Sequence, residues 1–108
     1  MKTDIVETGD FATFIKNGEK GTVCIFSASW CGPCVGLKKK IAEAGLEESL
    51  KDKVQWCVID VDEADDIAAE HNVQAMPTIK FFDKDGNTKG ETIVGASFDK
   101  VKAGAEGL

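Results

Sequence analysis

The chain has 108 residues, 43% of them hydrophobic and 30% charged, which suits one compact domain of residues 1–108 and is too short for two. Its net charge of −6, from 13 basic and 19 acidic residues, disfavours binding to the phosphate backbone of nucleic acids. No apolar run approaches the length of a membrane span, and acidic residues within positions 1–7 oppose a signal peptide, so we expect a cytoplasmic protein that binds no membrane.

The first half of the chain alternates between strand and helix patterns. A short apolar pair predicts a strand at residues 5–6, and apolar residues at helical spacing predict a helix over 10–17. The continuous apolar run within residues 21–27 is typical of a strand that is buried on both faces. A long helix is predicted over residues 31–50. Its basic residues are assigned to a solvated face: Lys38, Lys39 and Lys40.

The second half of the chain repeats the alternation and then forms a hairpin. A buried strand is predicted at residues 54–61, a short helix at 64–71 and a further strand at 78–82. A turn with Asp-Gly at its centre (83–87), a returning strand (91–94) and a final helix from residue 98 follow. Strands joined through helices are parallel, and a hairpin adds an antiparallel pair. We therefore predict an α/β fold with a central five-stranded mixed sheet flanked by four helices.

A Cys-x-x-Cys pair, Cys31 and Cys34, lies at a predicted strand-to-helix junction, where functional sites of such sheets gather. Residues three apart within a helix hold their Cβ atoms roughly 5–6 Å apart, whereas a disulfide needs roughly 3.5–4.5 Å. The first cysteine must therefore cap the helix, and Pro33 supports this because proline is tolerated in a first helical turn. We predict that the helix begins at Cys31 or one residue later.

The two sulfurs of this pair are expected to differ in reactivity. Free backbone N–H groups and the helix dipole near Cys31 favour its thiolate, whereas Cys34 lies one turn inside the helix and is shielded. Cys31 is predicted to attack a substrate disulfide, and Cys34 to resolve the mixed disulfide by attacking Cys31. Gly32 keeps the approach to the sulfur free of side chains.

An alternative interpretation of the same pair is half of a structural zinc site, which needs four ligands. Cys24 lies along an extended strand before Cys31, roughly 20 Å away at about 3.3 Å per residue, and cannot easily complete such a site. Cys24 and Cys57 are interpreted instead as small apolar fillers of central strands. His71, the only histidine, is expected to end a helix in solvent. We predict that the protein binds no metal.

Three segments of the sequence carry a family resemblance. Trp30-Cys31-Gly32-Pro33-Cys34 follows a buried strand, and Met76-Pro77-Thr78 and Val94-Gly95-Ala96 come later in the chain. Together they resemble the thioredoxin family along nearly the whole chain. The resemblance implies a thioredoxin fold with strand order 1-3-2-4-5 and a dithiol–disulfide oxidoreductase that reduces protein disulfides. It also implies a cis peptide bond before Pro77, which places this proline against the cysteine pair.

The resemblance further implies a docking surface and partners. Extended substrate segments would dock on a flat apolar patch around the pair, formed by Trp30, Gly32, Pro33, Met76, Pro77, Gly95 and Ala96. Met76 would offer its backbone to the substrate. The implied partners are client proteins that carry a disulfide and, as electron donor, a flavin-containing, NADPH-dependent thioredoxin reductase. The chain itself is expected to be a monomer without a cofactor of its own.

Two positions depart from the pattern of the family. Many members carry a buried aspartate six residues ahead of the nucleophile, where this chain has Ile25. Bacterial members often place a lysine on the neighbouring strand, where this chain has Val58. The family assigns the aspartate a role in proton transfer with the second cysteine. Without it, we expect Cys34 to be deprotonated by water, by the Cys31 thiolate or by a substrate group, and the pair to have a more oxidising potential or slower reduction.

Two other classes of function stay open. The first is a thiol oxidase or isomerase on the same fold; Gly32 and Pro33 between the cysteines favour a reductant over it, whereas Ile25 leaves it open. The second is a binding module in which the dithiol is secondary. A glutaredoxin is disfavoured, because the chain has no evident glutathione-binding signature beyond the shared fold.

Overall fold

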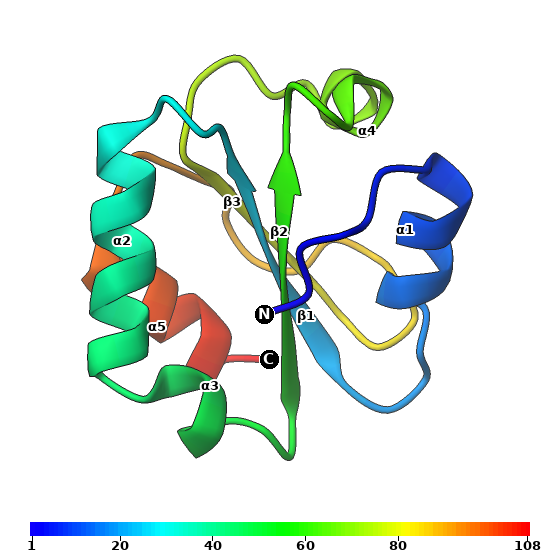
Figure 1. Cartoon of the computed structure of the whole chain (residues 1–108). Helices are drawn as coiled ribbons and strands as arrows, with labels where there is room; N and C mark the ends of the chain where they lie inside the picture. Colours follow the sequence, from blue (N-terminus) through cyan, green and yellow to red (C-terminus); the bar gives the residue numbers. More distant parts are fainter.

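A four-stranded mixed sheet forms the centre of the molecule in the computed structural model, which describes residues 1–108 (Figure 1). The strands are β1 (Gly21–Ser27), β2 (Val54–Asp60), β3 (Thr78–Phe82) and β4 (Ile93–Val94), in the spatial order β2-β1-β3-β4. β1 pairs parallel with β2 and antiparallel with β3, which in turn pairs antiparallel with β4. The sheet is therefore mixed, as the alternation of strands and helices predicts.

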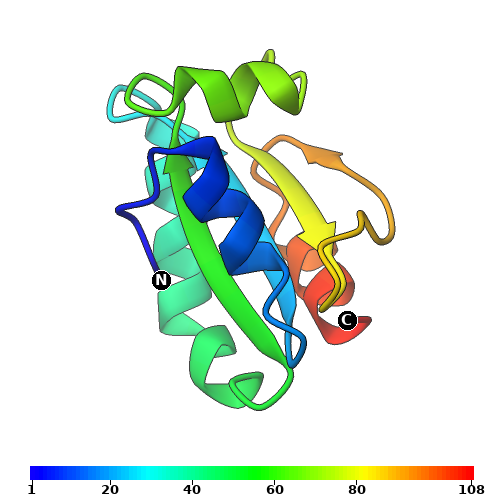
Figure 2. The ribbon, with the colours of Figure 1, turned by 90° about the vertical axis from the view of Figure 1, so that its right-hand side faces the viewer.

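Five helices cover the two faces of this sheet. They are α1 (Thr8–Ile15), α2 (Gly32–Glu43), α3 (Leu46–Ser49), α4 (Asp65–Glu70) and α5 (Phe98–Glu106). Helices α2, α3 and α5 lie on one face, and α1 and α4 lie on the other (Figures 1 and 2). The sheet is thus covered on both sides, which explains why every residue of β1 is buried.

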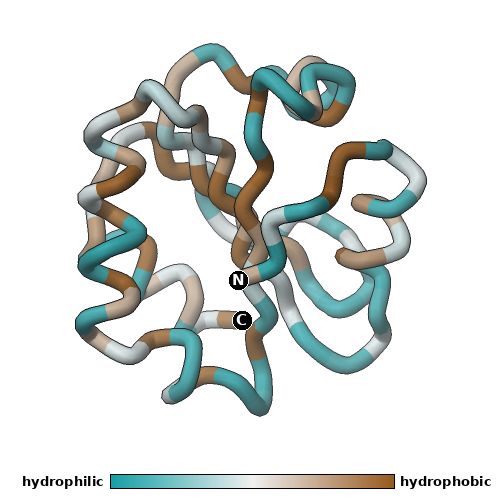
Figure 3. Tube along the Cα trace, in the orientation of Figure 1, coloured by the Kyte–Doolittle hydropathy of each residue, from teal (hydrophilic) through white to brown (hydrophobic).

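Successive residues of β1 supply two separate cores, because side chains along a strand point to opposite faces. Val23 and Ile25 belong to the core beneath α2 and α5, whereas Cys24 and Phe26 belong to the core beneath α1 and α4. The hydrophobic residues accordingly follow the strands at the centre of the trace, while the turn that connects α1 to β1 is hydrophilic (Figure 3). No helix of the structure is both long enough and apolar enough to cross a bilayer.

The prediction of a first strand at residues 5–6 is wrong, and this is why the sheet has four strands rather than five. The backbone near the N-terminus pairs with β2 only at Lys2, whose N–H donates to Trp56 O at 3.1 Å and whose carbonyl accepts from Val58 N at 2.8 Å. Ile5 is buried because it packs into the core beneath α1. The apolar character of Ile5 therefore reflects side-chain burial. The strand order 1-3-2-4-5 is otherwise present, with its first strand reduced to the single bridge between Lys2 and Cys57.

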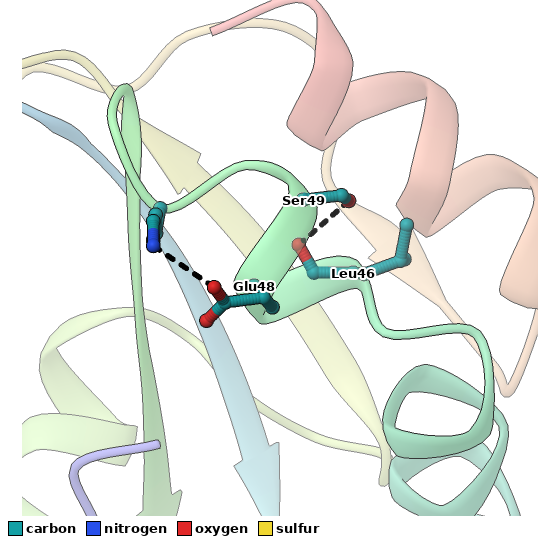
Figure 4. Close-up of polar contacts among 4 residues, drawn as sticks. Leu46, Glu48 and Ser49 are labelled. Atoms are coloured by element: carbon teal, nitrogen blue, oxygen red, sulfur yellow. Dashed lines mark hydrogen bonds and ion pairs between the residues drawn. The ribbon is translucent and has the colours of Figure 1, made fainter.

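The predicted helix over residues 31–50 is interrupted, which raises the number of helices from four to five. Gly45 adopts φ +64°, a left-handed conformation that glycine tolerates without strain, and it separates α2 from α3. The short α3 is closed by local contacts: the Ser49 hydroxyl donates to Leu46 O at 3.2 Å, and Lys51 pairs with Glu48 at 2.9 Å (Figure 4). The break lets Leu46 enter the core.

The returning strand of the hairpin is also shorter than predicted. It covers Ile93–Val94 instead of residues 91–94, although an isolated bridge joins Phe82 to Thr88 near the turn. Within the turn, Gly86 has φ +84°, and the Asp83 carboxylate accepts N–H bonds from Asp85 and Asn87 at 2.9 and 3.0 Å. The side chain of Asp83 therefore organises the turn, and less of the backbone pairs as strand.

Candidate active site

The cysteine pair lies where β1 ends and α2 begins, at the top of Figure 1. Cys31 is the N-cap of α2, with φ −89° and ψ 102°, and the helix starts at Gly32. Pro33 occupies the first helical turn. Cys31 and Cys34 are disulfide-bonded with their Cα atoms 5.3 Å apart. The prediction that the first cysteine caps the helix is confirmed, because only an extended cap residue brings its side chain back toward the first turn.

The two sulfur atoms of the pair have different surroundings. The Cys31 sulfur accepts a hydrogen bond from the backbone N–H of Cys34 at 3.2 Å, and it faces the positive end of the α2 dipole. Cys31 retains 5% exposure, whereas Cys34 has none. In the reduced protein, the same backbone donor and dipole stabilise negative charge on the Cys31 sulfur. The two sulfur atoms therefore differ in their exposure and in their hydrogen-bond donor.

The segment around Pro77 packs against this pair. The Met76-Pro77 peptide bond is cis, and Met76 contacts the small cluster that Ala28 forms with the two cysteines. The N–H of Gly95 donates to the Pro77 carbonyl at 2.9 Å, and Gly95 holds φ +109°, which favours glycine. The structure thus brings the loop before β3 and the end of β4 to the same edge of the sheet as the cysteines.

Trp30 stands beside the pair and is 66% exposed. Its indole N–H donates to the Asp62 carboxylate at 3.0 Å, which orients the ring over the loop that follows β2. Gly32 and Pro33 are also exposed. Ala96 follows Gly95, is exposed, and lines a surface hollow between α2 and α5 together with Phe98.

Two further side chains, those of Val94 and Asp62, lie at the end of the sheet that carries the cysteine pair. Val94 is 67% exposed, because Ile93 before it fills the core and the next side chain along a strand points outward. Asp62, in the loop that follows β2, accepts the hydrogen bond from the Trp30 indole. Val35 on α2 is exposed as well. The alternation of apolar residues up to Gly95 was the available signal for Val94, whereas nothing in the sequence indicates the Asp62 contact.

The floor beneath the pair is apolar. Ile25 is fully buried, is paired in register with Val58 on β2, and faces Ile79 on β3. The two positions at which the sequence departs from the family pattern are therefore neighbours in space. None of these three residues has an ionisable side chain, so none of them can accept a proton from Cys34.

The remaining cysteines and the histidine lie away from the pair. Cys24 and Cys57 are fully buried in the core beneath α1 and α4, on the opposite face of the sheet. His71 caps the C-terminus of α4, as predicted, but its ring is half-buried against Phe11 rather than in solvent. No group of three or more His, Cys, Asp or Glu side chains is close enough to hold a metal ion.

Comparison with known proteins identifies the family of this arrangement. The sequence matches the thioredoxin family over residues 2–105. It is 40% identical to thioredoxin of Equus caballus over 94 residues, covering 84% of this chain and 82% of that protein. It is 38% identical to Thioredoxin-2 of Pyricularia oryzae over 93% of this chain, although it spans only 55% of the length of that protein.

A solved structure shows the same fold. The chain superimposes on mitochondrial thioredoxin 3 of Saccharomyces cerevisiae in its oxidised form with a TM-score of 0.87 and 33% identity, covering 100% of this chain and 95% of that one. Thioredoxins are disulfide oxidoreductases that exchange electrons with disulfides of client proteins. The Cys31–Cys34 disulfide occupies the position of their redox-active pair. The chain belongs to the thioredoxin family.

Proposed function

We propose that the chain is a protein disulfide reductase in which Cys31 is the nucleophile and Cys34 resolves the intermediate. The observation that carries this assignment is the asymmetry of the pair. The Cys31 sulfur receives a backbone N–H and the positive end of a helix, whereas Cys34 is buried behind it. Trp30, next to Cys31 in the chain, and Val94, at the end of β4, are exposed apolar side chains, so an extended client segment has apolar surface on which to dock.

The reaction then proceeds in two exchanges that balance in electrons and protons. The Cys31 thiolate attacks one sulfur of a client disulfide, forms a mixed disulfide, and displaces the first client thiolate, which takes up a proton. Cys34 loses its proton and attacks the Cys31 sulfur, forming the Cys31–Cys34 disulfide and releasing the second client thiolate. The client gains two electrons, and the pair loses two.

We propose that Gly32, Pro33, Met76, Gly95 and Ala96 form the client-binding surface with Trp30, and that Pro77, whose side chain is fully buried, supports this surface from beneath. The exposure of Trp30, Gly32 and Pro33 supports this, as does the contact of Met76 with the cysteine cluster. Electrons would come from an NADPH-dependent thioredoxin reductase, because the chain's own pair must be returned to the dithiol after each cycle. We also propose a monomer that works in the cytoplasm, where Cys24 and Cys57 stay reduced.

Trapping the mixed disulfide tests the assignment of the two roles. Cys34→Ser, incubated with insulin as a disulfide substrate, should form a covalent adduct through Cys31 that dithiothreitol releases, measured by mass spectrometry. Cys31→Ser should form none. An adduct with Cys31→Ser that is as abundant as that of Cys34→Ser would contradict the proposal.

The apolar floor favours one second candidate, a thiol oxidase or isomerase. With Ile25 and Val58 in place of charged residues, no buried carboxylate opposes thiolate formation at the pair. A more stable thiolate makes the dithiol form more favourable and the disulfide more oxidising. The reduction potential of the pair separates this candidate from the reductase.

A further inference from the structure

A polar pocket of about 280 Å³ lies at the carboxyl ends of β1 and β2, directly beside the cysteine pair. Its lining includes Ser27, Ala28, Lys38, Val58, Asp60 and Glu63. Ala28 also packs against both cysteines, so one small side chain separates the pocket from the pair. The pocket is large enough to hold several water molecules and carries both cationic and anionic groups. It is therefore a polar region immediately next to a fully buried Cys34.

Lys38 places its ammonium group in this region. It follows Cys34 by one helical turn on the same face of α2, and long helical side chains lean toward the helix N-terminus. The Lys38 Nζ lies 3.4 Å from the Ser27 hydroxyl, at the end of β1 that carries the cysteines. No carboxylate lies within ion-pairing distance of it. The assignment of Lys38 to a merely solvated helix face is therefore incomplete.

The neighbouring Lys39 shows what a solvated lysine of this helix looks like. Its side chain is 76% exposed and lies 3.9 Å from Glu43 on the outer surface of the same helix. It has no contact with the strands or the pocket. The two adjacent lysines thus carry the same charge on the same helix, but only Lys38 reaches the end of β1 and lines the pocket.

The apolar residues beneath the cysteine pair provide no positive charge that could stabilise a thiolate, so a cation from α2 could fill this role. Val58 lines the pocket at the position where other members of the family often carry a lysine, and Ile25 replaces the buried aspartate. Resolution of the mixed disulfide requires Cys34 to lose a proton and hold a negative charge in an apolar cluster, which is unfavourable without a nearby positive charge. Lys38 is the only cationic residue that lines the pocket.

We propose that Lys38, held by Ser27, is a positioning residue that stabilises the thiolate of Cys34 during resolution, and that the proton of Cys34 leaves into the adjoining polar pocket. This inference rests on the proposed reductase function and explains how that function operates without the buried aspartate. The Cys34 sulfur loses its proton to solvent in the pocket and keeps the electron pair that forms the bond to Cys31. Lys38 stays protonated throughout. The other titratable groups that face the pocket are the Asp60 and Glu63 carboxylates.

A titration of the Cys34 thiol tests this role independently of client binding. In a Cys31→Ser background, the thiolate absorbance of Cys34 is followed against pH, and Cys31→Ser/Cys34→Ser is subtracted to remove Cys24 and Cys57. Lys38→Met should lower the thiolate fraction at pH 7 about three- to tenfold, which is the size of effect expected when one partly screened neighbouring charge is removed. Lys39→Met removes the same charge from the same helix and should leave the fraction unchanged.

Two results would overturn the inference. Equal shifts with Lys38→Met and Lys39→Met would mean that only net charge matters, and no shift with Lys38→Met would mean that the ammonium does not act on Cys34. Ser27→Ala, which leaves the charge but frees the side chain, should produce a smaller decrease in the same direction. A value equal to that of the parent would remove Ser27 from the proposal. Circular dichroism of each variant checks the fold.

The failure of this inference is distinguishable from the failure of the proposed function. Insulin reduction by the otherwise unmodified chain reports the reductase activity alone. If that activity is present and Lys38→Met matches Lys39→Met in the titration, the function stands and the role of Lys38 does not. If Lys38→Met also slows the resolution of a mixed disulfide at pH 7 in rapid mixing, and Lys39→Met does not, the reductase function and the role of Lys38 are both supported.

Discussion

The four cysteines form two pairs on opposite faces of the sheet, and only one pair is disulfide-bonded. Cys31 and Cys34 lie at the N-terminus of α2 and form a disulfide. Cys24 and Cys57 are register partners on the adjacent parallel strands β1 and β2, and both stay free. Parallel register brings the two residues of the second pair close together. Proximity between cysteines therefore does not by itself make a redox centre.

The surroundings of the two pairs explain the difference. At Cys31, a backbone N–H and the helix dipole stabilise a thiolate next to the surface. At Cys24, burial raises the pKa of the thiol well above its ordinary value, and the Cys57 thiol raises it further. A thiol that cannot ionise neither attacks a disulfide nor is readily oxidised. The N-terminus of α2 therefore distinguishes the Cys31–Cys34 pair from Cys24 and Cys57, which only pack in the core.

The largest expected effect comes from removing one cysteine of each pair. Cys31→Ser should reduce the rate of insulin reduction by several orders of magnitude, since it removes the proposed nucleophile. Cys57→Ala, the matched change in the second pair, should leave the rate within about twofold, because no contact joins Cys57 to the site on the opposite face. Turbidity of reduced insulin measures both. A large loss of activity with folded Cys57→Ala would break the comparison.

The next largest effect concerns the apolar floor beneath the reactive pair. Ile25→Asp buries a carboxylate with no cation beside it and should cost about 3–5 kcal/mol of the free energy of unfolding at pH 7. Urea denaturation measures this cost. Ile25→Val should cost only about 0.5–1.5 kcal/mol.

Adding the partner cation sharpens the same test. Ile25→Asp/Val58→Lys places an ammonium in register with the new carboxylate and should recover part of the lost stability. If Ile25→Asp alone were as stable as Ile25→Val, the floor would not be the dry apolar environment that the packing indicates.

A smaller effect is expected from polar substitution in the unreactive pair. Cys24→Ser places a hydroxyl in a fully buried apolar core and should cost about 1–3 kcal/mol. Cys24→Val keeps the site apolar at similar volume and should cost less than about 1.5 kcal/mol. Thermal unfolding of both variants gives the comparison, and a less stable Val variant would show that Cys24 acts through polarity rather than packing.

The smallest effect is a dependence of stability on pH in the core that holds the second pair. Burial lowers the pKa of His71, whose ring packs against Phe11, Phe26 and Phe82. The folded state thus favours neutral imidazole. Its contribution to stability is complete above the unfolded pKa of about 6.5 and decreases as the pH falls from there toward the lowered native value.

Unfolding of His71→Gln at several pH values measures this contribution. The variant should lose the part of the pH dependence that lies just below pH 6.5, while the dependence at lower pH, which belongs to the carboxylates, should remain. A parent whose stability is flat between pH 7 and pH 5.5 would contradict the assignment. Cys31–Cys34 chemistry should be unaffected, since His71 lies on the opposite side of the sheet.

Local signals in the sequence were sufficient for the central strands and for the reactive pair. The apolar run of β1 predicts a strand buried on both faces, and every residue of β1 is buried. Pro33 supports a helix that begins at Cys31 or one residue later, and α2 begins at Gly32. The predictions were wrong where the same hydrophobic pattern can arise from two different structures. Apolar residues at 5–6 indicated a strand, but Ile5 is buried by side-chain packing alone. The helical spacing continued past Gly45, whose left-handed backbone is a tertiary requirement.

Long-range side-chain contacts were beyond prediction from one sequence. The Trp30–Asp62 hydrogen bond joins residues from two loops that meet only in the folded sheet. The contact between Lys38 and Ser27 likewise depends on how α2 packs over the end of β1. Three adjacent lysines on one helix give no local sign of which one turns toward the strands.

The reduction potential of the Cys31–Cys34 pair tests the central claim most directly. A redox titration in glutathione or dithiothreitol buffers, with Trp30 and Trp56 fluorescence as the readout, gives the value. A reductant must lose its electrons to client disulfides, so we expect a potential below that of the cytosolic glutathione couple. Extraction methods place that couple at about −220 to −260 mV. A potential well above that range would mean that the pair prefers its dithiol form. The chain would then act as an oxidant or isomerase, and the reductase assignment would be wrong.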